Sequence, residues 1–225
     1  MYQVNELKST LATKIAAMLR IKIIKGAYAH DEHLNEVKIA AEYEVSRGPI
    51  REALKILENE GFAYTPSNGR TVAVAFTQKD FFDYHELRYF LEAEALKRII
   101  QNSDRDKHYT AWLDQIGRYV GIMEKSLGEY SEEEFNQSDF LFHKDIMKKS
   151  DNRIARNVWD SYSGIRDAIM VVNKHYLAGK SVTDIIFEPH LGIYEGLKQR
   201  DVEKAVQSCR VHMDNSIKLY ADAYK

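Results

Sequence analysis

The scarcity of proline restricts the fold of this chain more than any other feature of its sequence. Only three prolines, Pro49, Pro66 and Pro189, occur in 225 residues. Proline removes a backbone hydrogen-bond donor and interrupts helices, so the long stretches without it can be helical throughout. Apolar residues recur within those stretches at helical spacing, as at Ile15 and Leu19. We therefore expect a mainly α-helical protein.

One short region interrupts this helical pattern. The β-prone runs 62–65 and 71–74 flank the residues 66–69, Pro-Ser-Asn-Gly, whose Asn-Gly pair is typical of a tight hairpin turn. Three expected helices precede this hairpin, at about 6–25, 36–43 and 46–59. Three helices followed by a hairpin is the element order of a winged helix-turn-helix.

After Phe76 the apolar spacing is helical throughout. The expected helices lie at about 78–102, 105–129, 131–149, 152–175, 183–200 and 201–221. We therefore expect two domains, a winged helix-turn-helix DNA-binding domain over residues 1–76 and an all-helical bundle over residues 77–225.

The bulk composition excludes several classes of protein. Hydrophobic residues make up 44% of the chain and charged residues 29%, which is typical of a globular protein. The single cysteine, Cys209, excludes an intramolecular disulfide and a cysteine-based zinc finger. No run approaches the ~18 apolar residues that span a bilayer, and the polar N-terminus lacks the apolar core of a signal peptide. We expect a cytoplasmic protein with no membrane partner.

A stripe of cations lies on the third expected helix. Because the formal net charge is −2, a DNA-binding function has to depend on such a local face. Arg47, Arg51 and Lys55 recur every four residues, after Ser46, which suits the helix N-cap. This face fits the major groove, where arginine can bind guanine or phosphate. An ordinary solvated surface is the alternative, but the position between a short turn and a hairpin favours DNA.

The residues of this helix also carry a family resemblance. The string that begins at Val45 reads Val-Ser-Arg-Gly-Pro-Ile-Arg-Glu-Ala-Leu. With the flanking residues it resembles the GntR superfamily of transcription regulators. The resemblance implies that Ser46, Arg47 and Arg51 contact an operator, and that Gly69 lets the hairpin tip approach the minor groove.

One position departs from the family pattern. Val37 stands on the second expected helix where the family often has arginine or lysine. Lys38 is adjacent, but it points about 100° away on a helix. The preferred operator can therefore differ from those of relatives.

Four metal-ligating side chains are spaced so that a helical bundle could bring them together. Asp139 and His143 are four residues apart, which places them one turn apart on the same helical face. His190 lies near the start of a later expected helix, and His212 lies within the last one. One carboxylate and three imidazoles suit a divalent cation such as Zn²⁺ or Ni²⁺. The spacing alone leaves a chance arrangement on solvated faces open.

The C-terminal half resembles the FCD domain, the helical ligand-binding bundle of the FadR-like GntR branch. The matching segments are Leu87-Arg88-x-x-Leu91-Glu92, Asp139-x-x-Phe-His143-x-x-Ile146 with Ser150-x-Asn152, His190-x-x-Ile193, and His212. The resemblance implies that a divalent cation is ligated by Asp139, His143, His190 and His212.

The same resemblance suggests effector contacts. Arg88 would lie beside the metal and grip the carboxylate of a small organic acid, and Asn152 matches a polar position of the family. For Arg88 the alternative is a surface ion pair with Glu92, and for Asn152 it is a helix N-cap.

These observations predict a ligand-responsive, DNA-binding transcription regulator and not an enzyme. We expect a homodimer that binds a pseudo-palindromic operator in double-stranded DNA and that responds to an organic-acid effector at a metal site. The alternatives are a metal-dependent hydrolase and a helical interaction module. No glutamate stands beside a metal histidine as in a His-Glu-x-x-His helix. The hydrolase would also leave Arg47, Arg51 and the hairpin unexplained, and either alternative predicts no sequence-specific binding to a promoter fragment.

Overall fold

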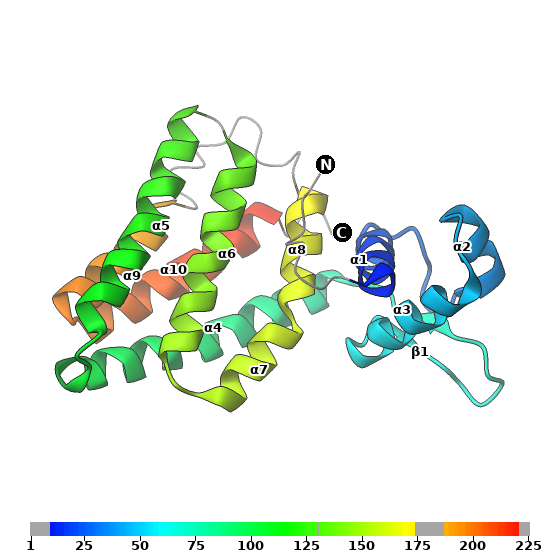
Figure 1. Ribbon diagram of the computed structural model, residues 1–225, viewed down its shortest axis with the longest axis horizontal. Coiled ribbons are helices and arrows are strands. Elements are labelled where there is room, and N and C mark those ends of the chain that lie inside the picture. Colours follow the sequence, from blue (N-terminus) through cyan, green and yellow to red (C-terminus); the bar gives the residue numbers. More distant parts are fainter. Residues whose placement is uncertain (1–9, 130, 174–186, 221–225) are drawn as a thin grey trace. The chain divides into compact units, whose positions relative to one another are not determined.

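The computed structural model describes residues 10–129, 131–173 and 187–220. These residues form two compact units (Figure 1). The first contains residues 10–77 and 161–173, and the second contains residues 78–129, 131–160 and 187–220. The N-terminal unit thus ends beside the boundary expected at residue 76, and it also includes one helix from within the C-terminal sequence.

The first unit contains a winged helix-turn-helix, which confirms the predicted fold class. Its elements are α1 (Leu11–Ile24), α2 (Glu36–Glu42), α3 (Arg47–Asn59), β1 (Ala63–Tyr64), β2 (Val72–Ala73) and α8 (Ser163–Asn173). The two strands pair antiparallel. At the tip, the Gly69 amide donates to the Pro66 carbonyl at 2.9 Å. Gly69 has a φ of 74°, a conformation that favours glycine, so the expected tight turn is present.

Helix α1 supports α3. Ile15 and Leu19, which belong to its apolar stripe, are fully buried, and α1 packs against α3. Arg20 is only 6% exposed, and its guanidinium donates to both carboxylate oxygens of Glu60, at 2.8 and 2.7 Å. This fork joins α1 to the C-terminal end of α3. Residues 6–9, which the sequence assigns to the same helix, lie outside the described residues.

Helix α8 packs against α1 within the first unit. A Cβ at Gly164 would lie 2.8 Å from Cζ of Arg20, so the missing side chain makes room for the guanidinium. The prediction of one helix over 152–175 was wrong at Tyr162, between α7 (Arg153–Ser161) and α8. The Tyr162 carbonyl accepts from the Ile165 amide at 3.0 Å, a spacing shorter than that of an α-helix. Residues 174 and 175 lie outside the described residues.

The second unit is an all-helical bundle. Its elements are α4 (Gln78–Asn102), the 3-10 helix η1 (Ser103–Arg105), α5 (Tyr109–Glu129), α6 (Glu132–Lys149), α7, α9 (Glu188–Gln199) and α10 (Val202–Tyr220). Helices α5 and α6 pack side by side, and α4 contacts α6 and α10 (Figure 1). The helix expected from residue 105 begins later, after η1. Residues 183–186 of the helix expected at 183–200 lie outside the described residues. None of the described helices is long and apolar enough to span a membrane.

Helices α9 and α10 approach each other closely because α9 presents glycines to α10. A Cβ at Gly196 would lie 2.6 Å from the backbone nitrogen of Ala205, and one at Gly192 would overlap the side chain of Ser208. Any larger residue would therefore push the two helices apart. This packing positions the histidines that both helices contribute to the bundle interior.

Candidate nucleic-acid interface and candidate metal centre

Helix α3 has one cationic face and one apolar face. Arg47, Arg51 and Lys55 are exposed. The opposite face is buried through Ile50, Ala53, Leu54 and Leu57. Ser46 occupies the N-cap position, as expected, but its hydroxyl makes no capping hydrogen bond. That hydroxyl is exposed at the start of the cationic face, beside Arg47.

A glutamate that the sequence analysis did not single out joins two of these cations. Glu36, in the first turn of α2, accepts through Oε2 from Arg47 Nη2 at 2.7 Å and from Arg51 Nε at 2.9 Å. The hydrogen bond from Arg47 lowers the pKa of Glu36 below its ordinary value, against a smaller effect of burial. Glu36 and Arg47 lie on different helices, so no spacing within one helix marks the contact in the sequence.

The hairpin tip and α2 each contribute a further exposed position to this unit. Gly69 is exposed at the tip, and the neighbouring Arg70 amide donates to Asn68 Oδ1 at 3.0 Å. Val37 is 60% exposed on α2. The position where the family often carries a cation is thus a solvent-facing valine.

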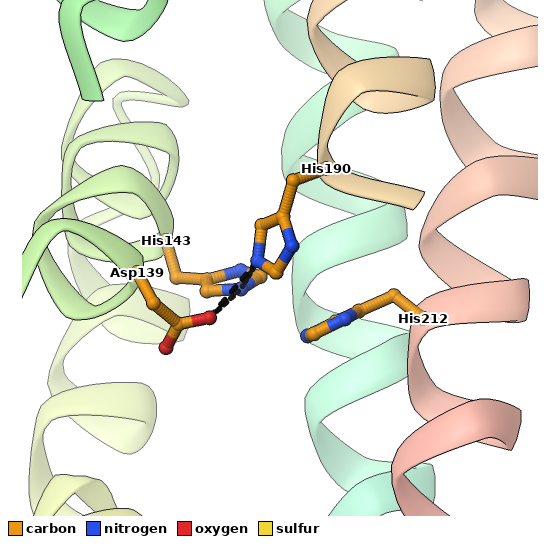
Figure 2. Close-up of side chains that lie close together, drawn as sticks. All are labelled: Asp139, His143, His190 and His212. Atoms are coloured by element: carbon orange, nitrogen blue, oxygen red, sulfur yellow. Dashed lines mark hydrogen bonds and ion pairs between the residues drawn. The ribbon is translucent and has the colours of Figure 1, made fainter. Parts of the chain in front are cut away.

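The four predicted metal-ligating side chains converge in the second unit (Figure 2). Asp139 and His143 come from α6, His190 from α9 and His212 from α10. All four are buried, and one ligand-type atom of each lies within 4.8 Å of the others. His190 Nε2 lies 2.9 Å from Asp139 Oδ1 and 3.0 Å from His143 Nε2. Helix α6 and the consecutive helices α9 and α10, which follow it much later in the sequence, therefore bring these groups to one point.

The donor set of this cluster fits a divalent metal ion. Burial lowers the pKa of His212 well below its ordinary value, and the neighbouring His190 and His143 lower it further. The buried Nδ1 of His212 has no hydrogen-bond partner. A neutral imidazole keeps a lone pair for a cation. Three imidazoles and one carboxylate at this separation match the ligands that Zn²⁺ and Ni²⁺ use.

Arg88 and Glu92 lie on α4, beside the cluster. They form the ion pair that the sequence offered as an alternative, but Arg88 is only 7% exposed and Glu92 1%. Glu92 accepts from Arg88 Nε at 3.0 Å, and its other oxygen lies 2.7 Å from His143 Nδ1. The Nη2 nitrogen of Arg88 lies 2.9 Å from Glu92 without hydrogen-bond alignment. The pair that was the surface alternative is thus buried and in contact with the cluster.

Asn152 lies at the start of α7. Its Oδ1 accepts from the Ala155 amide at 3.1 Å, which is the helix-capping alternative. Its own amide donates to Ser150 Oγ at 3.3 Å. Helix capping therefore accounts for its side-chain oxygen.

A winged helix-turn-helix with a cationic reading helix, combined with a helical unit that buries a polar cluster, is the architecture of a ligand-responsive transcription regulator. Residues 11–72 match the family described as bacterial regulatory proteins, gntR family, and residues 83–215 match the FCD domain. The chain therefore belongs to the GntR family of bacterial regulatory proteins and carries an FCD domain.

Individual relatives agree with this assignment. The gluconate operon transcriptional repressor of Bacillus subtilis (strain 168) is 24% identical over 210 residues, which cover 92% of this chain and 84% of the repressor. The Nta operon transcriptional regulator of Aminobacter aminovorans is 35% identical over 121 residues, 54% of this chain and 55% of that regulator. The solved structure of E. coli McbR/YncC has the same fold, with a TM-score of 0.70 at 16% identity over 97% of this chain and 100% of that one.

Family and fold together establish the function in outline. The protein is a DNA-binding transcription regulator with an effector-binding domain, and it is not an enzyme. The hydrolase and interaction-module alternatives are not favoured.

Proposed function

We propose that this regulator acts in the cytoplasm as a homodimer on a pseudo-palindromic operator, and that a small carboxylate metabolite bound at a divalent metal modulates its DNA binding. The observation that carries the proposal is the convergence of Asp139, His143, His190 and His212 in the buried interior. A ligand bound there can alter DNA affinity only if it favours one of two states that differ in operator binding.

The proposed operator contacts are Ser46, Arg47, Arg51, Lys55 and Gly69. The side chains of Arg47 and Arg51 are 54% and 58% exposed, so both guanidinium groups are accessible to a duplex. Their hydrogen bonds to Glu36 can be exchanged for base edges or phosphates. At the hairpin tip, Gly69 has no side chain to prevent close approach to the DNA backbone.

The charge of the cluster favours an anionic effector. A dication held by one carboxylate and three neutral imidazoles carries a net charge of about +1. When bound, the metal supplies a Lewis-acidic position for a carboxylate oxygen. Arg88, whose Nη2 has no hydrogen-bond partner, can donate to the same carboxylate. We propose Zn²⁺ or Ni²⁺ as the metal and an organic acid as the effector, and Asn152 stays a predicted effector contact.

One relative supports this class of ligand. The Bacillus subtilis protein with 24% identity is the repressor of a gluconate operon. Gluconate is a polyhydroxylated monocarboxylate, so it carries the group that a cationic metal centre and an arginine bind. Sugar acids are therefore the first effector class to test, with citrate as a second organic acid.

Exposed apolar side chains on the second unit support the homodimer. Phe90 and Phe82 on α4 are 58% and 37% exposed, and Val211 on α10 is 39% exposed. Exposed apolar and aromatic residues are typical of protein–protein contacts. We expect light scattering of the full chain at micromolar concentration to show a dimer. A monomer under those conditions contradicts this part of the proposal.

The decisive experiment couples DNA binding to metal and effector. A site is selected from a random duplex library with the wild-type protein, and its affinity is measured with gluconate and with citrate, before and after chelation. We expect one acid to change the affinity about 5- to 150-fold, and chelation to abolish the change until Zn²⁺ is restored. A response that survives chelation contradicts the metal-dependent mechanism. No response to either acid contradicts the proposed effector class.

A further inference from the structure

Glu92 occupies the centre of a buried hydrogen-bond network that joins three helices. It lies on α4, and its Oε2 is 2.7 Å from Nδ1 of His143 on α6. Its Oε1 accepts from Nε1 of Trp159 on α7 at 2.9 Å and from Nε of Arg88 at 3.0 Å. Both carboxylate oxygens are therefore engaged in the interior, where hydrogen-bond geometry is strictly maintained.

The contact with His143 determines which ring nitrogen carries the proton. A carboxylate can only accept, so the Nδ1 of His143 has to donate a hydrogen to it. In a neutral ring, the lone pair is then at Nε2. That atom lies 3.0 Å from Nε2 of His190 and 3.6 Å from Oδ1 of Asp139, so the lone pair is on the side of the ring that faces the other ligand-type atoms.

The buried carboxylate of Glu92 is surrounded by donors, one of which is a cation. Arg88 Nε and Trp159 Nε1 donate to Oε1, and Oε2 lies against Nδ1 of His143. Arg88 also compensates the charge, so the pair adds little net charge to the interior. An ionised acceptor binds an imidazole N–H more strongly than a neutral one does.

We propose that Glu92 is a positioning residue of the metal centre, which holds His143 with Nδ1 protonated and Nε2 directed at the metal. The inference rests on the metal site proposed above and adds a residue that is not itself a ligand. Carboxylates that accept from a ligating histidine fix its orientation and raise its basicity. Trp159 and Arg88 hold the carboxylate in turn, so α4 and α7 contribute to the centre without supplying a ligand.

The first test compares two variants on the same helix. Glu92→Gln keeps the volume and removes the charge, and Glu94→Gln makes the same change at an exposed position two residues later. Zn²⁺ affinity is measured by competition with a chromogenic chelator. We expect about a 10- to 100-fold loss for Glu92→Gln and no change for Glu94→Gln. If Glu92→Gln binds Zn²⁺ as the wild type does and only its thermal midpoint falls, the role is structural and the proposal is wrong.

A second measurement needs no variant, and it decides the matter if Glu92→Gln does not fold. Long-range ¹H–¹⁵N spectra of the Zn²⁺-loaded wild type identify the coordinating nitrogen of each histidine. We expect His143 to coordinate through Nε2 and to show a protected, downfield Nδ1–H proton. Coordination of His143 through Nδ1 overturns the proposal. A wild-type protein that binds no Zn²⁺ instead contradicts the metal site itself, so the two failures are distinguishable.

Discussion

Each unit of this protein contains a glutamate that holds functional side chains together, and the two glutamates lie in opposite environments. Glu36 lies at the surface with its side chain 28% exposed, between Arg47 and Arg51, which are more exposed still. Glu92 lies in the interior with its side chain 2% exposed, against a fully buried His143. Both use a carboxylate to accept hydrogen bonds from two or more side chains.

The difference in burial decides what each contact can do. An exposed ion pair contributes ~0–1 kcal/mol, so the two arginines can leave Glu36 for DNA at little cost. A buried charge that loses its partner is left uncompensated, which costs about 3–5 kcal/mol. The proposed operator-binding surface is therefore adaptable, whereas the interior cluster is preorganised. The predictions below test this contrast, from the largest expected effect to the smallest.

Removal of a proposed ligand should have the largest effect. In His143→Ala we expect metal content to fall from about one ion per chain to nearly none, because a three-ligand remnant binds weakly. Mass spectrometry of the metal in purified protein measures this directly. His108→Ala, which changes an exposed histidine of the same unit, is the control and should keep its metal. Stoichiometric metal in His143→Ala would refute the site as described.

Loss of the buried cation should be the next largest effect. Arg88→Met keeps an unbranched apolar stem but removes the guanidinium and leaves Glu92 without its charge partner, so we expect a loss of about 3–5 kcal/mol in unfolding free energy. Urea titration of the metal-free protein, followed by tryptophan fluorescence, is the measurement. Lys79→Met breaks the exposed pair with Asp83 on the same helix, and should leave the unfolding free energy unchanged within the error of the titration. Equal losses of unfolding free energy in Arg88→Met and Lys79→Met would contradict the difference between surface and interior pairs.

Loss of a reading arginine should affect DNA binding and leave the fold intact. We expect Arg47→Ala and Arg51→Ala each to weaken operator binding by about 1–3 kcal/mol and to relax base discrimination. Band-shift titrations at fixed salt measure this, with Arg118→Ala in the second unit as the control. Lys55→Ala should weaken all duplexes alike, as a phosphate contact does. Unchanged affinity in both arginine variants would place DNA reading on another element.

The smallest effect should follow from Glu36→Gln. Its unfolding free energy should change by less than ~0.5 kcal/mol, because the ion pairs it breaks are exposed. Affinity for random-sequence DNA should rise, with a salt dependence steeper by up to ~1 in slope, because the arginines lose their acidic competitor. Fluorescence anisotropy over a salt series provides both values, with Glu94→Gln as the control for charge. A destabilisation as large as that of Arg88→Met would show that exposure does not determine how much an ion pair contributes to the unfolding free energy.

The regions that the sequence predicted well are those whose contacts are local. Helix α3 formed with its cations on one face because residues four apart share a face in any helix. The hairpin formed around Gly69 because the turn needs a left-handed residue there. Features that depend on distant segments were missed or misjudged. Glu36 reaches Arg47 across two helices. The break at Tyr162 was also missed, although Gly164 follows it closely, because an isolated glycine does not by itself end a helix.

By itself, the sequence determined the helical class, the order of the elements and the identity of the residues that gather in the bundle. Only the tertiary structure decided which of them are buried. Lys79–Asp83 and Arg88–Glu92 have the same four-residue spacing on the same helix, yet the first pair is exposed and the second is in the interior. Spacing along a helix determines which side chains can meet. Whether those side chains are covered depends on helices from distant parts of the chain. Burial in turn determines how strongly their charges interact.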